Sequence, residues 1–232
     1  MKSTLTKLAL SSALLMSSSL FALEVDVKII NLTKGIYFTP LLVSAHKANA
    51  KLFTAGQSAS VSLQKMAEGG DISGLVSDLT AKGATSVEDP AGGLLAPGAS
   101  AVATLSTTVG NDYLSIVAMM LPTNDGFIAM NSVKMPTVKG TYKYELNAHD
   151  AGTEANDEII NGAGTPNAAG IPAAPDGNGG TGATGLTSTA EGFVHIHRGN
   201  IGDFSKAGGR SDINALTHRF LNPVASVIIT VK

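Results

Sequence analysis

Two apolar segments separated by a short polar turn place the strongest limit on how this chain can fold. They occupy residues 114–121 and 127–130, and the turn between them has the sequence Pro-Thr-Asn-Asp-Gly. Short apolar runs bounded by turn residues are typical of buried strands. A third segment, residues 141–147, alternates in side-chain character and also resembles a strand. These segments predict the central strands of a β-sheet.

The loops next to these strands carry acidic residues. Asp125 lies in the turn, and Asp150 and Glu154 follow the third segment. If both loops lie at the same end of the sheet, the three carboxylates converge and repel one another. A calcium ion would relieve this repulsion, because it takes about six to eight oxygen ligands. The spacing within residues 150–158 excludes an EF-hand. The residues alone leave both a metal site and a solvated acidic loop open.

Other segments with strand character lie on both sides of the central strands. They are residues 24–32, residues 36–45 with an interruption at Pro40, and residues 100–108, 191–197 and 223–232. Proline has no N–H to donate to a ladder, so Pro40 is expected at an edge or a bulge.

Residues 55–83 have a different periodicity and predict two short helices over one edge or mouth of the sheet, with Asp71 as a candidate cap. Residues 212–220 predict one more short helix. Strands outnumber helices, and the two do not alternate along the chain. We therefore expect an all-β sandwich of about eight strands with short peripheral helices.

The first 22 residues have the features of a secretory signal peptide. Lys2 and Lys7 precede a short apolar core at residues 8–15, and Ala22 offers a cleavage point. The segment is too short to span a membrane. We expect a single mature domain at residues 23–232 that is secreted, periplasmic or on the cell surface. Within it, the Gly-, Ala- and Pro-rich residues 162–190 predict a flexible loop.

Composition excludes several classes of function. Removal of residues 1–22 leaves fourteen basic and eighteen acidic residues, a net charge of −4, and the chain has no basic run and no tryptophan, so we expect no nucleic-acid partner. No later apolar stretch is long enough to cross a bilayer, so we expect no transmembrane segment. The absence of cysteine excludes disulfides, thiolate metal sites and cysteine nucleophiles.

The sequence also gives no sign of catalysis. No Gly-x-Ser-x-Gly elbow occurs, and the seven phenylalanines and four tyrosines are too scattered for the aromatic platforms of a carbohydrate-cleaving cleft. We expect that the protein is not an enzyme.

His195 and His197 suggest a second kind of metal chemistry. Alternate residues of a strand face the same side, so the two imidazoles could share a zinc or copper ion. A metalloprotein or metalloenzyme built on these residues is the alternative function. Hydrogen-bonded surface histidines are the simpler interpretation, because a third ligand is not evident.

A set of short motifs covers nearly all of residues 25–232. The motifs are Asn-Leu-Thr at 31–33, Pro40, His46, Leu-Gln-Lys-Met-Ala-Glu at 63–68, Leu-Ser-Ile-Val-Ala-Met at 114–119, Pro-Thr-Asn-Asp at 122–125, Asp-Ala-Gly-Thr-Glu at 150–154 and Asn-Pro-Val-Ala at 222–225. Together they resemble the spondin N-terminal domain family. The pairing of Pro-x-x-Asp with Asp-Ala-Gly-Thr-acidic is the most specific part of the resemblance.

The resemblance implies a C2-like antiparallel β-sandwich that binds calcium at one end through Asp125, Asp150 and Glu154. This chain differs from the animal members at two positions: Glu154 stands where they have aspartate, and Gly126 where they have tryptophan. The implied function is a non-catalytic adhesion or binding module for a surface or matrix ligand, either protein or glycan. A structural component of an outer surface, with residues 162–190 exposed, is a further possibility.

Overall fold

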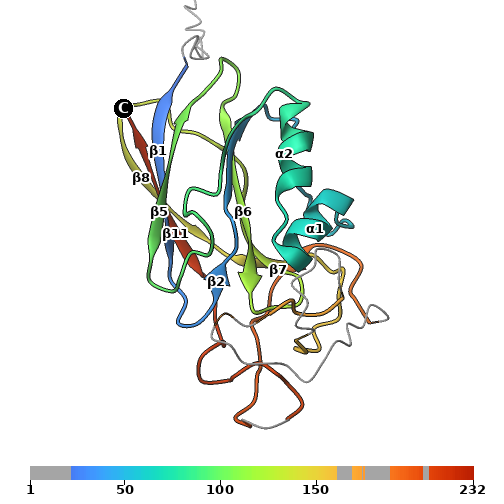
Figure 1. The fold of residues 1–232 in the computed structure, drawn as a ribbon. Coiled ribbons are helices and arrows are strands. Elements are labelled where there is room, and N and C mark those ends of the chain that lie inside the picture. Colours follow the sequence, from blue (N-terminus) through green and yellow to red (C-terminus); the bar gives the residue numbers. More distant parts are fainter. Residues whose placement is uncertain (1–21, 161–168, 174, 176–188, 206–208) are drawn as a thin grey trace, which may run out of the picture.

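The chain folds into two antiparallel β-sheets that pack face to face (Figure 1). The computed structural model describes residues 22–160, 169–173, 175, 189–205 and 209–232. All but the last residue of the predicted signal peptide (residues 1–22) and most of the predicted loop at residues 162–190 lie outside the described residues. Within the described residues the strands belong to a four-stranded and a seven-stranded sheet, which confirms the predicted all-β sandwich.

The smaller sheet has the strand order β5-β1-β11-β8. Its strands are β5 (Ser100–Ser106), β1 (Glu24–Asn31), β11 (Ala225–Val231) and β8 (Gly140–Leu146). Along β1, Val25, Val27 and Ile29 are fully buried, whereas Glu24 and Lys28 are exposed. This alternation follows from an antiparallel sheet with one face on the core and one face in water.

The larger sheet has the order β10-β9-β7-β6-β3-β4, and β2 pairs with β6. Its strands are β10 (His195–Ile196), β9 (Ala148–Asp150), β7 (Gly126–Lys134), β6 (Tyr113–Leu121), β3 (Leu42–His46), β4 (Thr85–Glu88) and β2 (Tyr37–Phe38). β4 was not predicted. Pro40 lies in the gap between β2 and β3, as expected of a residue that cannot donate to the ladder.

The central strands β3 and β6 of the larger sheet are buried on both faces because two helices cover the outer one (Figure 1). These are α1 (Val61–Gly69) and α2 (Ser73–Thr80), which confirms the two predicted short helices. Along β6, Ile116 faces the space between the sheets, and Val117 packs in the layer under the helices. The run at residues 114–121 is therefore apolar apart from Ser115, whose hydroxyl lies 2.7 Å from the His46 ring.

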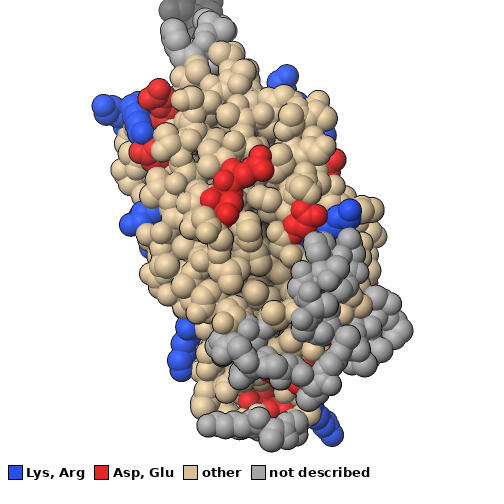
Figure 2. Space-filling view, viewed as in Figure 1, with Lys and Arg blue, Asp and Glu red and all other residues tan. Residues whose placement is uncertain are grey.

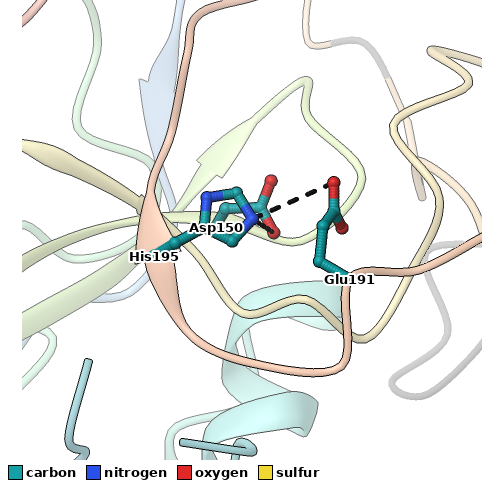
Figure 3. A group of neighbouring side chains, drawn as sticks. All are labelled: Asp150, Glu191 and His195. Atoms are coloured by element: carbon teal, nitrogen blue, oxygen red, sulfur yellow. Dashed lines mark ion pairs between the residues drawn. The ribbon is translucent and has the colours of Figure 1, made fainter. Parts of the chain in front are cut away.

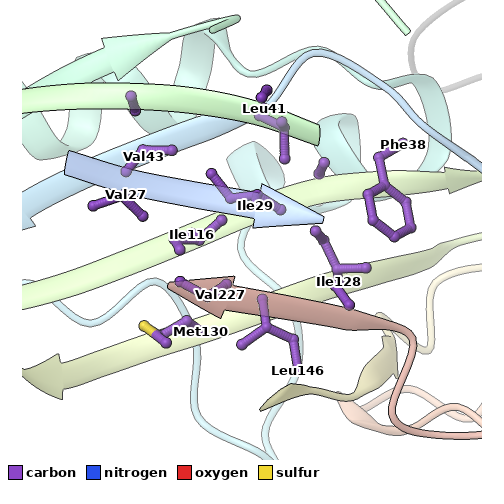
Figure 4. Close-up of a cluster of buried hydrophobic side chains, with 14 of the residues drawn as sticks. Val27, Ile29, Phe38, Leu41, Val43, Ile116, Ile128, Met130, Leu146 and Val227 are labelled. Carbon is purple, nitrogen blue, oxygen red and sulfur yellow. The ribbon is translucent and has the colours of Figure 1, made fainter. Parts of the chain in front are cut away.

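Between the sheets lies the main apolar core (Figure 4). Val27 and Ile29 from β1 and Val227 from β11 meet Ile116 and Ile128 from the larger sheet. Each such side chain contributes roughly 1.5–3 kcal/mol relative to an exposed position. This packing fixes the relative position of the two sheets and of the loops at their ends.

Two local predictions need correction. Asp71 is not the N-cap of α2, which is Ile72; the Asp71 carboxylate instead accepts the N–H of Ser73 at 2.9 Å. Residues 212–220 form turns and not a helix. There the Asn214 side chain accepts the N–H of Leu216, and the His218 ring accepts the N–H of Asn214. Such side-chain bonds compete with helical ones.

The outer surface carries few charges on the side shown in Figure 2, where lysine and arginine side chains lie mainly around the margin. None of the helices in the described residues has the length and apolar character that a membrane span requires.

Candidate metal site

Strand pairing brings the acidic loops together at one end of the larger sheet. The turn between β6 and β7 holds Asp125, and the last residue of β9, Asp150, pairs with Gly126. The third predicted central strand, β8, lies in the other sheet, and the chain crosses at Asn147 to form β9 beside β7. The Ala151 N–H then donates to the Asp125 carbonyl at 3.1 Å, which joins the two loops.

Asp125 is fully buried, and only one of its two carboxylate oxygens is hydrogen-bonded. Its Oδ2 accepts hydrogen bonds from the Thr153 N–H at 2.6 Å, the Thr153 hydroxyl at 3.1 Å and the Glu154 N–H at 3.1 Å. Its Oδ1 is buried and has no hydrogen-bond partner. Burial, together with the charge of Asp150, raises the pKa of Asp125 to about 7. An ionised carboxylate at this position is costly unless a cation compensates for it.

Glu154 is also a buried acid with one carboxylate oxygen that has no hydrogen-bond partner. Its side chain is 1 % exposed; Oε1 accepts the Gly170 N–H at 2.6 Å, and Oε2 is buried without a partner. Burial and then the nearby Glu68 charge raise the pKa of Glu154 to about 9. Ile171, next to Gly170, is fully buried, so this described part of the predicted loop at residues 162–190 packs against the site.

Asp150, the third predicted ligand, is 1 % exposed. Its Oδ1 accepts the Gly152 N–H and its Oδ2 accepts the Asn156 side-chain amide, both at 2.8 Å. A carboxylate oxygen has more than one lone pair, so both oxygens keep capacity for a cation.

The donors at this end are carboxylate oxygens, the ligand type that a hard cation takes. Buried carboxylate oxygens are normally hydrogen-bonded, and the free Asp125 Oδ1 and Glu154 Oε2 are exceptions that need a partner. Calcium binds carboxylate oxygens, and its positive charge would balance the negative charges of these side chains. Asp125, Asp150 and Glu154 are the residues that would hold it.

Glu68 is a further buried acid at this end that the sequence analysis did not identify as a site residue. It lies on α1, is 2 % exposed and accepts the Gln64 amide at 2.8 Å. Burial raises its pKa, and the Thr153 hydroxyl partly offsets that effect. The signal in the sequence was a charged residue directly after the apolar Met66 and Ala67, within the motif at residues 63–68 that contributed only to the family resemblance.

Gly126 and Gly152 allow the loops to approach each other closely. A Cβ on Gly126 would lie 2.6 Å from the Thr123 hydroxyl oxygen and 3.0 Å from the His197 ring, so no side chain fits where the animal members have tryptophan. Gly152 has a φ of +67°, and a Cβ there would overlap the Phe193 backbone. Residues 150–154 are thereby held against the segment that leads into β10.

The two histidines of the alternative metal site have different surroundings. His197 is buried, and its Nδ1 accepts the Gly199 N–H at 2.9 Å, so the proton of the neutral ring is on Nε2. That nitrogen therefore has no lone pair for a metal. Burial lowers the pKa of His197 to about 4. The predicted shared site on His195 and His197 is not supported by this arrangement.

His195 instead faces two acids. Its Nε2 lies 3.5 Å from Asp150 Oδ1 and 3.9 Å from Glu191 Oε1 (Figure 3). In the described residues these three side chains form a group whose ligand atoms all lie within 4.8 Å of one another, and Asp125 and Glu154 are not members of it. Glu191 was not predicted as a site residue. Its position four residues before His195 in a segment with strand character was the available signal.

Fold and site together define an all-β sandwich domain with a buried acidic site at one end. A model of the Spondin_N family matches residues 31–162, more than half of the chain, and the chain belongs to the spondin N-terminal domain family. A search among curated proteins finds no match. Domains of this family are typically extracellular and generally non-enzymatic.

Proposed function

We propose that the chain is a secreted calcium-binding domain that acts as a non-catalytic adhesion module. The observation that carries the calcium assignment is the pair of buried carboxylate oxygens without partners, Asp125 Oδ1 and Glu154 Oε2. Two buried acids with raised pKa values, whose charges repel each other, support this assignment because a divalent cation would offset that repulsion.

Bound calcium would act through the loops that carry its ligands. Asp125 belongs to the turn between β6 and β7, and Asp150 and Glu154 belong to the loop after β9. An ion held by both loops ties them together and sets the shape of this end of the sandwich. The ion binds the folded state and not the unfolded chain, so it also raises stability by mass action.

The partner we propose is a ligand on a surface or matrix, either protein or glycan. Family membership supports an extracellular setting. The ion-dependent shape of the loops gives a means of presenting a binding surface only where calcium is abundant, as it is outside cells.

The calcium proposal is tested by thermal unfolding of the purified protein in chelator and in millimolar calcium. We expect calcium to raise the melting temperature, and Asp150→Asn to abolish most of that rise. The exposed Asp78 on α2 provides the matched control, because Asp78→Asn removes the same charge away from the site. An equal rise in Asp150→Asn and in the control would remove Asp150 from the ligand set.

A further inference from the structure

We propose that Asp150, Glu191 and His195 form a second metal site, for a borderline divalent cation such as zinc. It lies at the same end of the sandwich as the proposed calcium site and shares Asp150 with it. Figure 3 shows the His195 ring joined by ion pairs to the Asp150 and Glu191 carboxylates.

The distances suit a shared ion better than a direct ion pair. His195 Nε2 lies 3.5 Å from Asp150 Oδ1 and 3.9 Å from Glu191 Oε1. A charge-assisted hydrogen bond would measure about 2.7–2.9 Å. Tetrahedral zinc with bonds of about 2.0–2.1 Å separates its ligand atoms by about 3.3–3.5 Å. Small movements of the three side chains would therefore bring their ligand atoms to bonding distance of one ion.

The tautomer of His195 is already correct for binding a metal. Its Nδ1 lies 3.0 Å from the Ile196 carbonyl oxygen. A carbonyl can only accept, so Nδ1 carries the proton and Nε2 has the lone pair in the neutral ring. Nε2 is buried and has no hydrogen-bond partner. Histidines that bind metals typically donate the other ring N–H in this way.

Surrounding groups hold both carboxylates in place. The Asn156 side-chain amide donates to Asp150 Oδ2 at 2.8 Å and to Glu191 Oε1 at 3.2 Å. His195 and Asp150 are direct partners across the β9–β10 ladder. The Gly192 N–H donates to the Gly152 carbonyl at 2.8 Å, which anchors the residue after Glu191. Bonds of this kind orient metal ligands and strengthen binding.

The ligand types indicate the metal. One imidazole with two carboxylates suits zinc and its neighbours in the first transition row, whereas calcium takes oxygen ligands. The His195 and Glu191 side chains are 27 % and 33 % exposed, so an ion here would keep a coordination position open to water. Three protein ligands and one open position are the arrangement of an accessible zinc site.

This inference does not rest on the calcium proposal, and variants separate the two sites. Titration calorimetry of the purified protein with zinc alone should show one equivalent bound. His195→Ala and Glu191→Gln should each weaken zinc binding by about 100-fold or more, since loss of an orienting group alone costs 10–100-fold. Both variants should bind calcium as the wild type does. Asp125→Asn should lose calcium and keep zinc, and Asp150→Asn should lose both.

Cobalt substitution supplies a spectroscopic readout that a purely structural role would not change. Cobalt in the tetrahedral site should give a visible absorption band that His195→Ala lacks. If that variant misfolds, the nearly isosteric Glu191→Gln decides the matter. Zinc affinity that is unchanged in Glu191→Gln, or the absence of a zinc equivalent in the wild type, overturns the proposal. Loss of calcium binding alone would leave it standing.

Discussion

The space between the two sheets and the acidic end of the larger sheet are both buried. Apolar side chains fill the first, whereas the second contains carboxylates. Ile29 and Phe38 in the core are fully buried, and so are Asp125 and Glu154 at the acidic end, to within 1 %. Burial of apolar side chains stabilises the fold, whereas burial of carboxylates costs free energy unless something compensates for their charge. The core is stable by burial alone, whereas the carboxylates of the acidic end must be protonated or, as we propose, neutralised by a cation.

Because of this difference, the stability of the acidic end should depend on ions and pH, whereas that of the core should not. Changes in the core should affect stability equally with and without calcium. Changes at the acidic end should have effects whose size or sign depends on the ion and on pH.

The largest effect is expected in the core. Phe38→Ala should lower the free energy of unfolding by about 3–5 kcal/mol, because it leaves a cavity at a fully buried position. Urea denaturation should give the same loss in calcium and in chelator. A loss that differs strongly between the two conditions would show that the core and the acidic end are not independent.

A pH dependence should mark the acidic end. The pKa of Glu154 is raised from 4.5 to about 9, so between these values the folded protein keeps a proton that the unfolded chain has released. Stability therefore falls as pH rises. In chelator, we expect the free energy of unfolding to fall from pH 7 to pH 9, by on the order of 1 kcal/mol per pH unit.

Between pH 7 and pH 9 the slope reports the buried acids and not His197. The pKa of His197 is lowered from 6.5 to about 4, so its contribution is lost only as pH falls below 6.5. Denaturant unfolding at several pH values measures the slope. Glu154→Gln should remove most of it, and calcium should reduce it in the wild type. A slope that persists in Glu154→Gln would assign it to another group.

The smallest effect compares two glycines. Gly152 and Gly56 both have positive φ, but a Cβ on Gly152 would overlap the Phe193 backbone, whereas a Cβ on Gly56 would meet nothing within 4 Å. Either change to alanine should cost about 1 kcal/mol from backbone strain. Gly152→Ala should cost roughly 1 kcal/mol more, and only this variant should bind calcium more weakly. Equal effects would mean that the approach of the two loops is unimportant.

Much of the fold could be predicted because the signals are local. The alternation in β1 and the continuous apolar run of β6 each reflect how many faces of the strand are covered. The division of strands between sheets could not be predicted, since pairing is not local. The placement of β8 in the smaller sheet, with β9 returning to the larger one after a single residue, depends on contacts far apart in the chain.

The same distinction applies to the candidate sites. Asp125 and Asp150 were expected to lie near each other because both follow central strands. Glu68 and Glu191 were missed because a helix and a distant loop bring them to this end, and neither has a spacing that indicates it. The environment of His197 depends on the Gly199 N–H, a bond that strand periodicity does not predict.

The most direct test of the central claim is a crystal structure of the protein grown with calcium, with an anomalous difference map. We expect a peak coordinated by Asp125, Asp150 and Glu154, with the oxygens Asp125 Oδ1 and Glu154 Oε2 among the ligands. A map with no peak there, at calcium concentrations well above those that change the melting temperature, would contradict that claim.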